Sequence, residues 1–199
     1  MTTAEYLNQL LLSYSGSFNI YQPYVINSKT YPAYGYFYSF TEKYVLVREA
    51  NMWSTKCFEH VLFMEADELT DKVFAEAEAI IKEYMEPVLV RKNEPLPEEN
   101  HMYSYLNVII VCQKSLNKAM AQKVKKFRFE KGYRFNMRGY SQGSIMCVTV
   151  DDRKYCSNYY GKSKKKMFYK VFEDVLQGKP GFAQVMEEKG LTPFKQENF

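Results

Sequence analysis

The sequence predicts an α+β fold with a mixed, largely antiparallel sheet flanked by about four helices. Segments in which every second residue is apolar or aromatic, as in strands, alternate irregularly with segments of helical period. Their order is helix, three strands, helix, strand, helix, two or three strands, helix. Residues 105–112 are apolar almost throughout, as in a strand covered on both faces. We therefore expect this segment in the interior of the sheet.

Length and composition favour one domain over residues 1–199. A chain of 199 residues, 46% hydrophobic and 25% charged, can bury a core without disulfides or metal ions. No run approaches the roughly 18 to 20 apolar residues of a membrane span, and residues 1–19 lack the pattern of a signal peptide. These absences favour a cytoplasmic location. The cysteines are widely spaced, so we expect reduced thiols and no intramolecular disulfide. They are Cys57, Cys112, Cys147 and Cys156.

The N-terminal segment predicts one helix followed by a loop. Thr2 or Thr3 can cap a helix whose apolar residues recur on one side and which ends near Gly16. Residues 17–33 carry turn formers and no sustained period. We expect them to form a loop that packs onto the core.

The period changes to two from residue 34 onward, with aromatic residues sharing one face. This alternation predicts a hairpin of residues 34–40 and 44–49, with its turn at residues 41–43. Residues 58–65 predict a third strand.

A second helix is expected to begin after Thr70 and to carry an apolar stripe as far as Met85, with Pro87 ending it. Residues 91–100, which contain two prolines, are the best candidate boundary in the chain. The stretch is short and is followed by the central strand. We therefore expect one domain, with a weak subdivision at most.

The C-terminal half predicts further helices and strands. Ser115 or Asn117 can cap a third helix that runs to Lys131, where a glycine ends it. Strands are expected at residues 133–138 and 144–150. After these, residues 151–154 predict a hairpin turn into a short strand near Tyr155, residues 163–177 predict a fourth helix, and a short terminal helix follows.

The charge is strongly polarised along the chain. Residues 114–170 hold 16 basic and three acidic side chains, whereas the remainder holds 11 basic and 20 acidic ones. The net charge of +4 therefore hides a basic region of about +13 and a remainder of about −9. This asymmetry suggests a polyanionic partner for the basic half, or an acidic region that shields it within the same protein.

Candidate polyanion-binding residues lie in the third helix, just after it, and at the start of the fourth helix. They are Lys123, Lys125, Lys126, Arg128, Phe129, Arg134, Arg138, Lys162, Lys164, Lys165 and Lys166. Phe129 falls opposite the apolar side of a helix over residues 117–131, where it could stack on a base or turn inward if the helix has already ended. The lysines at the fourth helix oppose the positive end of its dipole, so they either hold an anion or are simply solvated.

The aromatic content is unusual, with 18 tyrosines and 14 phenylalanines against one tryptophan. Two interpretations stay open. The rings fill core and sheet positions, or they form a stacking surface.

Motifs for catalysis or metal binding are largely missing. Gly161-Lys162-Ser163 resembles the end of a phosphate loop, but Cys156 stands where the first glycine belongs. His60 and His101 are the only histidines and have no metal-ligand spacing. We therefore assign no catalytic residue, metal or cofactor, and the sequence favours a non-enzymatic role.

Two resemblances to known families can be stated. The element order of the first 113 residues resembles PD-(D/E)xK nucleases, which hold a divalent metal with an acid and a (D/E)-x-Lys triplet on adjacent strands. The third strand has acids but no lysine in register, and Asp152-Arg153-Lys154 lies in a predicted turn. This departure implies that a nuclease-like fold would be inactive. Separately, Lys125-Lys126-Phe127, residues 133–140 and residues 148–157 resemble an uncharacterised bacterial domain family, which implies no activity.

These observations predict a non-enzymatic binding protein whose basic half engages nucleic acid or another polyanion. The alternative is a protein-interaction or oligomeric module in which the basic half of one molecule meets an acidic surface of another. That surface would contain Glu65, Asp67, Glu68, Glu76 and Glu83. Either way, we expect no membrane partner.

Overall fold

The computed structural model describes residues 1–43 and 53–196. Helix α1 (Thr3–Ser15) begins where the sequence offers a capping box. The Thr2 hydroxyl accepts a hydrogen bond from the Glu5 amide, and the Glu5 carboxylate accepts one from the Thr2 amide. The predicted first helix is therefore confirmed, with Thr2 as its cap.

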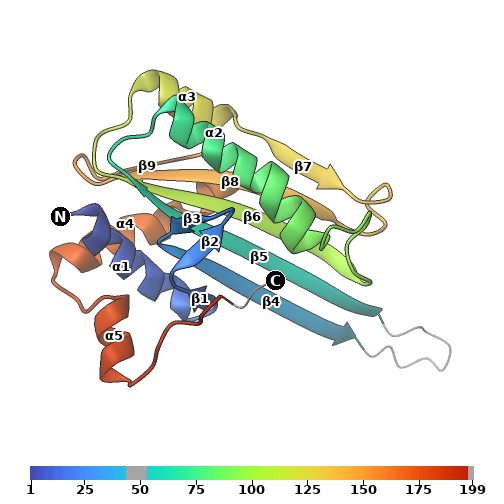
Figure 1. Ribbon diagram of the computed structural model, residues 1–199. Coiled ribbons are helices and arrows are strands. Elements are labelled where there is room, and N and C mark those ends of the chain that lie inside the picture. Colours follow the sequence, from blue (N-terminus) through green and yellow to red (C-terminus); the bar gives the residue numbers. More distant parts are fainter. Residues whose placement is uncertain (44–52, 197–199) are drawn as a thin grey trace.

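A seven-stranded sheet forms the centre of the molecule, in the order β1-β4-β5-β6-β8-β7, with β9 also pairing with β8 (Figure 1). Its strands are β1 (Asn19–Tyr21), β4 (Ala33–Lys43), β5 (Trp53–Ala66), β6 (His101–Cys112), β7 (Phe129–Gly132), β8 (Tyr140–Thr149) and β9 (Lys154–Ser157). The β5–β6 and β6–β8 pairs are parallel, and the other pairs are antiparallel. The predicted α+β class, with a mixed and largely antiparallel sheet, is confirmed, and β6 lies in its interior.

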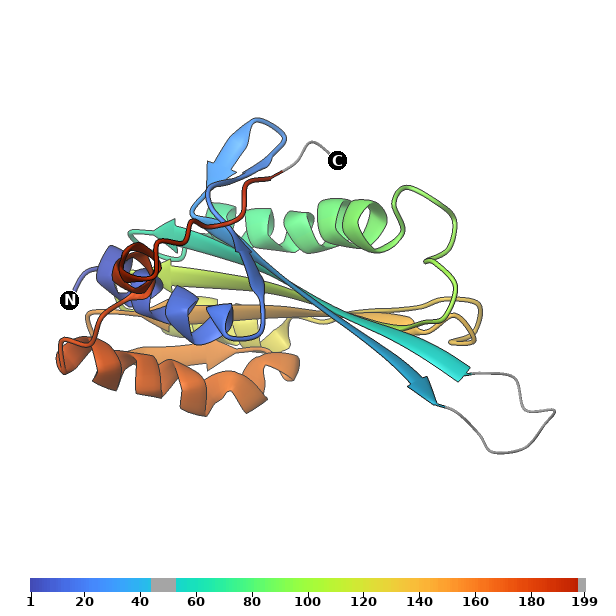
Figure 2. The same ribbon diagram turned by 90° about the horizontal axis from the view of Figure 1, so that it is seen from below.

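Helices cover both faces of this sheet (Figures 1 and 2). One face carries α2 (Asp71–Ala79), the π-helix η1 (Ile80–Val90) and α3 (Lys118–Lys126). The other face carries α1, α4 (Lys165–Leu176) and α5 (Phe182–Glu188). Alternate side chains of the central strands enter the two cores, so that Leu62 packs under α2 and η1 while Val61 packs under α1 and α4. Among the described residues, no helix is long and apolar enough to cross a membrane.

The segment predicted as a loop at residues 17–33 contains three short strands. Besides β1, it forms the two-stranded hairpin of β2 (Tyr24–Ile26) and β3 (Lys29–Tyr31). This hairpin folds over the α2 face, where the Tyr24 and Tyr84 hydroxyls lie 2.8 Å apart. Strands of three residues are too short to show a period in the sequence, which is why they were not predicted.

The first predicted hairpin is longer than expected. Residues 41–43 were predicted as a turn, but they continue β4 and pair with the beginning of β5. The return strand predicted at residues 44–49 lies outside the described residues. The third strand predicted at residues 58–65 is confirmed as part of β5.

The helix that begins after Thr70 does not end at Pro87. It passes from α2 into η1, which contains Pro87 and continues to Val90. Pro87 has no amide hydrogen and so leaves one hydrogen bond of the helix unmade, but the wider turn of the π-helix continues past it to Val90. The predicted stop was therefore wrong, although the cap at Thr70 is confirmed by its bond from the Val73 amide.

The third helix is shorter than predicted. Asn117 caps α3, which ends at Lys126 rather than Lys131, and Phe127 is already extended with ψ of 134°. The Phe127 ring is buried beside Phe74, and residues 129–132 pair with β8 as β7. Pairing at the sheet edge outweighs the helical propensity of this lysine-rich segment.

Residues 133–138 were predicted as a strand but form a turn. Arg134, Phe135 and Asn136 all have positive φ, and the Phe135 side chain is fully exposed. The Tyr133 amide donates to the Gly139 carbonyl and closes the turn. The remaining C-terminal predictions agree better: β8, β9 and α4 are present, and a 3₁₀ turn, η2 (Tyr160–Lys164), precedes α4.

Candidate functional site

The first basic segment lies at the end of α3. The side chains of Lys123, Lys125 and Lys126 are exposed because the apolar side of α3, with Met120 and Val124, faces the core. The Lys123 ammonium forms an ion pair with Asp71 at 2.6 Å. Arg128 is exposed as well, and its guanidinium donates to the carbonyls of Lys125 and Phe127.

The second basic segment spans η2 and the first turn of α4. Lys162, Lys165 and Lys166 are exposed, and no side chain caps this helix start. Lys164 differs, because its ammonium turns inward and lies 2.8 Å from the Glu59 carboxylate on β5.

Asn158 fixes the two basic segments at one edge of the sheet. Its fully buried amide donates to the carbonyl of Phe127 at 3.4 Å and to that of Gly143 at 3.0 Å, and it accepts from the Ser144 hydroxyl at 2.9 Å. The end of α3 is thereby tied to the β9–η2 junction, while α3 and α4 pack on opposite faces. We call the exposed cations of these two segments, taken together, the basic edge. It consists of Lys125, Lys126, Arg128, Lys162, Lys165 and Lys166.

The other predicted site residues lie elsewhere or are already engaged. Phe129 begins β7 and is half-buried against the core beside Gly143, as expected if the helix ends before it. Arg134 and Arg138 belong to the turn at the far end of β7, where Arg138 contacts Glu99 at 3.6 Å. The structure therefore does not gather all the predicted residues into one cluster.

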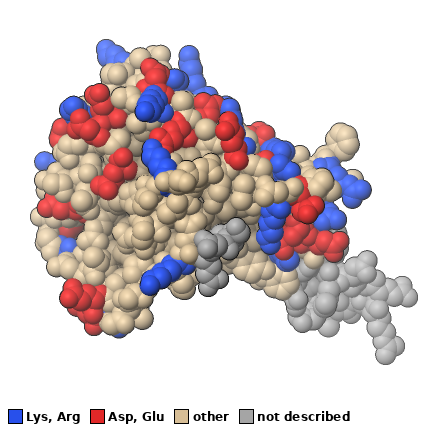
Figure 3. All heavy atoms as spheres, viewed as in Figure 1, with Lys and Arg blue, Asp and Glu red and all other residues tan. Residues whose placement is uncertain are grey.

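Ion pairs between the acidic and basic parts of the chain offset part of the polarised charge. The pairs are Asp67–Lys114, Asp71–Lys123, Glu86–Lys131, Glu99–Arg138 and Glu59–Lys164. In Figure 3, positive and negative side chains are interspersed along the upper and right margins of the molecule. Within the described part of the chain, no carboxylate forms an ion pair with a residue of the basic edge.

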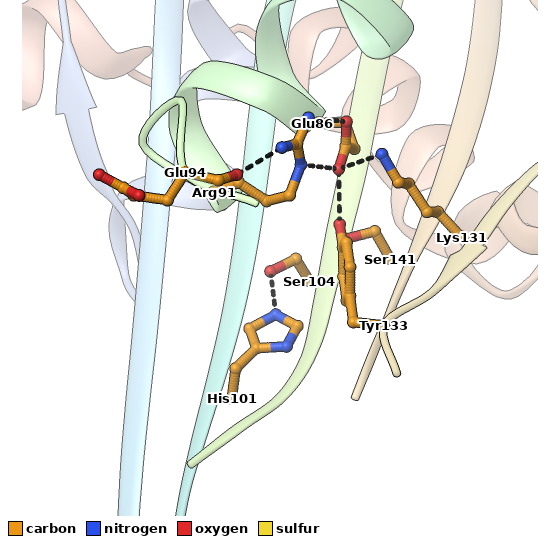
Figure 4. Close-up of polar contacts among 8 residues, drawn as sticks. All are labelled: Glu86, Arg91, Glu94, His101, Ser104, Lys131, Tyr133 and Ser141. Carbon is orange, nitrogen blue, oxygen red and sulfur yellow. Dashed lines mark hydrogen bonds and ion pairs between the residues drawn. The ribbon is translucent and has the colours of Figure 1, made fainter. Parts of the chain in front are cut away.

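A buried carboxylate, Glu86, organises the end of η1 (Figure 4). It accepts hydrogen bonds from the Arg91 guanidinium at 2.6 Å, the Lys131 ammonium at 2.9 Å and the Tyr133 hydroxyl at 3.0 Å. Burial alone would raise the pKa of Glu86, but these donors lower it. The network therefore anchors η1, and the turn that follows it, to β7 and to Tyr133.

A cavity of about 520 Å³ lies between η1 and the strands β1, β4 and β5. Its lining is mainly aromatic and apolar, and the residues are Tyr21, Tyr34, Tyr36, Phe58, His60, Val88, Leu89, Val90, Lys92, Asn93 and Glu98. This aromatic cavity was not predicted from the sequence. The alternation of Tyr34 with Tyr36, and of Phe58 with His60, places these rings on one face and is the signal that could have indicated it.

The floor of the aromatic cavity contains a histidine that stays neutral. The His60 ring is 4% exposed, and its Nδ1 lies 2.6 Å from the Tyr34 hydroxyl. Burial, with a smaller effect from His101, lowers the pKa of His60 to about 3. Phe58 stacks between the two histidines, with ring centroids 6.4 Å from His60 and 5.9 Å from His101.

Comparison with known families identifies one match. The family model described as "Domain of unknown function (DUF8052)" matches residues 2–170. The chain belongs to this family. No curated protein and no solved structure matches it. The DUF8052 match extends from α1 into α4, and therefore includes both the basic edge and the aromatic cavity.

The expectation of an uncharacterised domain family is confirmed by the DUF8052 match, whereas a bacterial origin stays a prediction. In the ranges that the structure describes, no group of three His, Cys, Asp or Glu side chains could hold a metal ion. The acid on β5 that meets a lysine is Glu59, and that lysine, Lys164, comes from η2 rather than from the same strand. The Asp152–Lys154 pair joins a turn to β9, so neither pair forms the (D/E)-x-Lys arrangement of the nucleases on one strand.

Proposed function

We propose that the chain is a non-enzymatic binding protein whose basic edge engages a polyanion, with nucleic acid as the favoured ligand. The observation that carries this proposal is the Asn158 contact, which holds two lysine-rich segments from different parts of the sequence at one edge. Of the six cationic side chains, Lys125 and Lys126 belong to α3, Arg128 follows it, and Lys162, Lys165 and Lys166 belong to η2 and α4.

The chemistry of this surface suits phosphate groups. Lysine and arginine side chains that neutralise phosphates release condensed counterions, which favours binding at low salt and needs no catalytic residue. Lys123, Lys164 and Arg138 already contact carboxylates, so they contribute less to such an attraction. Phe129 packs on the core and offers no free ring face comparable to an exposed aromatic. The proposed surface is therefore narrower than the set of residues predicted from the sequence.

The experiment compares two charge-matched variants. In the first, Lys125, Lys126, Lys165 and Lys166 are replaced by glutamine; in the control, the exposed Lys72, Lys82, Lys179 and Lys189 are replaced in the same way. Binding to a mixed-sequence oligonucleotide is measured by fluorescence anisotropy at several salt concentrations. We expect the edge variant to lose affinity and to reduce the salt slope by roughly one unit per lost phosphate contact, while the control keeps most of both.

Two results would overturn the proposal. One is the absence of binding by the unmodified protein near about 50 mM salt, where electrostatic attraction is strong. The other is an equal loss of affinity in both variants, which would assign binding to net charge rather than to the edge. Sedimentation of the free protein tests the alternative: a dimer that dissociates when the edge lysines are replaced would instead indicate self-association through acidic and basic surfaces.

A further inference from the structure

The aromatic cavity is built from elements that the basic edge does not use. It lies between the end of η1 and the strands β1, β4 and β5, which form one edge of the sheet. The basic edge lies along β7 and β9, at the opposite edge. Its volume of about 520 Å³ falls within the range of pockets that hold small organic ligands. An inference about it therefore does not depend on polyanion binding.

One nitrogen of His60, a residue that lines this cavity, has no hydrogen-bond partner among the described residues. Tyr34 occupies Nδ1 of His60, but Nε2 has no hydrogen-bond partner among residues 1–43 and 53–196. Within the same residues, the Tyr14 hydroxyl is the only fully enclosed side-chain polar atom that lacks a partner. Since His60 lines the cavity, its Nε2 is left open to a molecule inside it. Because Nε2 is not fully enclosed, a ligand in the cavity can reach it and form the hydrogen bond that the protein does not supply.

The other groups around the cavity indicate what else that ligand carries. Tyr21, Tyr36 and Phe58 offer ring faces and edges, opposite the aliphatic side chains of Val88 and Leu89. Such walls favour a flat aromatic ring system over a branched or strongly polar molecule.

The rim of the cavity is positively charged. Its two charged residues are Lys92 and Glu98, and the Glu98 carboxylate is paired with the Lys56 ammonium at 2.5 Å. Lys92 is exposed and forms no ion pair with a described carboxylate. Its amide donates to the Val88 carbonyl at 3.1 Å, which holds the Lys92 backbone at the end of η1 with a positive φ of 53°.

We propose that the aromatic cavity binds a small planar aromatic acid. The ring system would lie between the Tyr36 and Phe58 side and the Val88 side, with a polar atom bonded to His60 Nε2 and the anionic group directed toward Lys92. Because Lys92 supplies the only unpaired charge on the described rim, the anionic group contributes to affinity, while the rings supply most of the buried area.

The test uses 2-naphthoate as the probe and 2-naphthylmethanol as its neutral analogue, with binding measured by isothermal titration calorimetry. In Val88→Trp the larger side chain fills the cavity, and we expect both compounds to bind at least about tenfold more weakly. In Lys92→Gln the cavity is unchanged, and we expect a loss of about fivefold for 2-naphthoate with little change for the alcohol. Val175→Trp, a change on α4 at the opposite face, is the matched control and should leave both affinities unaltered.

The outcomes separate this proposal from the basic edge. Binding of 2-naphthoate that is unaffected by Val88→Trp would overturn it, as would a folded native protein that binds neither compound at roughly 1 mM. If Val88→Trp fails to fold, the Lys92→Gln comparison decides, because equal losses for the acid and the alcohol would contradict the assigned orientation. Oligonucleotide binding should be the same for Lys92→Gln and the native protein, whichever way the cavity result falls.

Discussion

Tyr34 on β4 reaches diagonally to His60 on the adjacent strand β5, with the tyrosine hydroxyl 2.6 Å from Nδ1 of the imidazole. The contact is buried, and the stacked ring of Tyr24 covers Tyr34 at a centroid distance of 4.3 Å. Removal from water favours the neutral imidazole, which is why the pKa of His60 falls to about 3. Burial also lowers the pKa of His101.

These two histidines make the stability depend on pH. Below the ordinary histidine pKa of about 6.5, the unfolded chain binds protons that the folded state excludes, so the free energy of unfolding decreases as the pH falls. We expect His60 to contribute roughly 1 kcal/mol per pH unit between about pH 6 and pH 5, and His101 to add to the slope in the same direction. Urea denaturation across this range measures the slope. His60→Gln should lower this slope by the equivalent of about one bound proton. An unchanged slope in this variant would show that His60 binds a proton as readily in the folded protein as in the unfolded chain.

We expect removal of the buried Glu86 carboxylate to destabilise the protein. Glu86→Gln takes the charge from a site where Arg91, Lys131 and Tyr133 converge, and it leaves two cations without their partner. Because both cations reach solvent in part, we expect a loss of about 2 kcal/mol, less than for a fully buried pair. Glu83→Gln, an exposed position on the same helix, is the control and should change the free energy of unfolding by less than about 0.5 kcal/mol.

The sign of the Glu86 pKa shift adds a second measurement. A lowered pKa in the folded state means that the contribution of Glu86 is present above the ordinary glutamate pKa and is lost as the pH falls through the lower, folded value. The difference in stability between native protein and Glu86→Gln should therefore be larger at pH 7 than at pH 3. Equal differences at the two pH values would argue that the carboxylate contributes by shape rather than by charge.

Asn158→Ala should destabilise the protein by about 2 to 3 kcal/mol, since it removes the side-chain donor to the Gly143 carbonyl, the acceptor of the Ser144 hydroxyl and one of the two side-chain donors to the Phe127 carbonyl. Thermal and urea denaturation measure this loss. Gln122→Ala, on the exposed side of α3, removes a similar amide and should be nearly neutral. A cost below about 1 kcal/mol for Asn158→Ala would show that water replaces the lost contacts.

Gly161 is required by space rather than by backbone conformation. A Cβ atom there would lie 2.7 Å from the Ser157 Cβ and 2.8 Å from the Met146 Cγ, although the residue does not have a positive φ. We expect Gly161→Ala to cost about 1 to 3 kcal/mol. At Gly16 a Cβ meets nothing within 4 Å, so Gly16→Ala should be neutral or stabilising by up to about 1 kcal/mol. Comparable effects at the two glycines would contradict the steric explanation.

The sequence predicted the elements whose pattern is local and long. The alternation in β4 and β5, the apolar run of β6 and the helical stripes of α2 and α4 all extend over several repeats. The continuation of the second helix through Pro87 was missed because the contacts that hold it, from Lys131 and Tyr133 to Glu86, come from residues more than forty positions away. The turn after Tyr133 was missed because aromatic alternation resembles a strand even where no neighbouring strand is available.

The sequence predicted which cationic residues belong to the candidate site, but not which of them are neutralised by ion pairs. The lysines of the basic edge are visible in the sequence, yet Lys164 is neutralised by Glu59, which lies 105 residues earlier. No local pattern distinguishes Lys164 from Lys165, one turned toward the sheet and the other exposed. The aromatic cavity depends in the same way on the position of η1 relative to β1, β4 and β5. The spacing of tyrosines in the sequence does not specify that position.

The Asn107 amide on β6 donates a hydrogen bond to the Glu59 carboxylate on β5, and this contact bears on how β6 finds its correct alignment. Residues 108–111 of β6 are apolar on both faces, so sliding the strand by one residue between its parallel neighbours would cost little hydrophobic burial there. The same shift would reverse the polar side chains. The Asn107 amide would leave Glu59, 2.8 Å away, and enter the core beneath η1, while Nδ1 of His101 would lose the Arg138 carbonyl, 2.9 Å away. These polar contacts from β6 to its neighbours thus specify a strand registry that the apolar residues beside them leave undetermined.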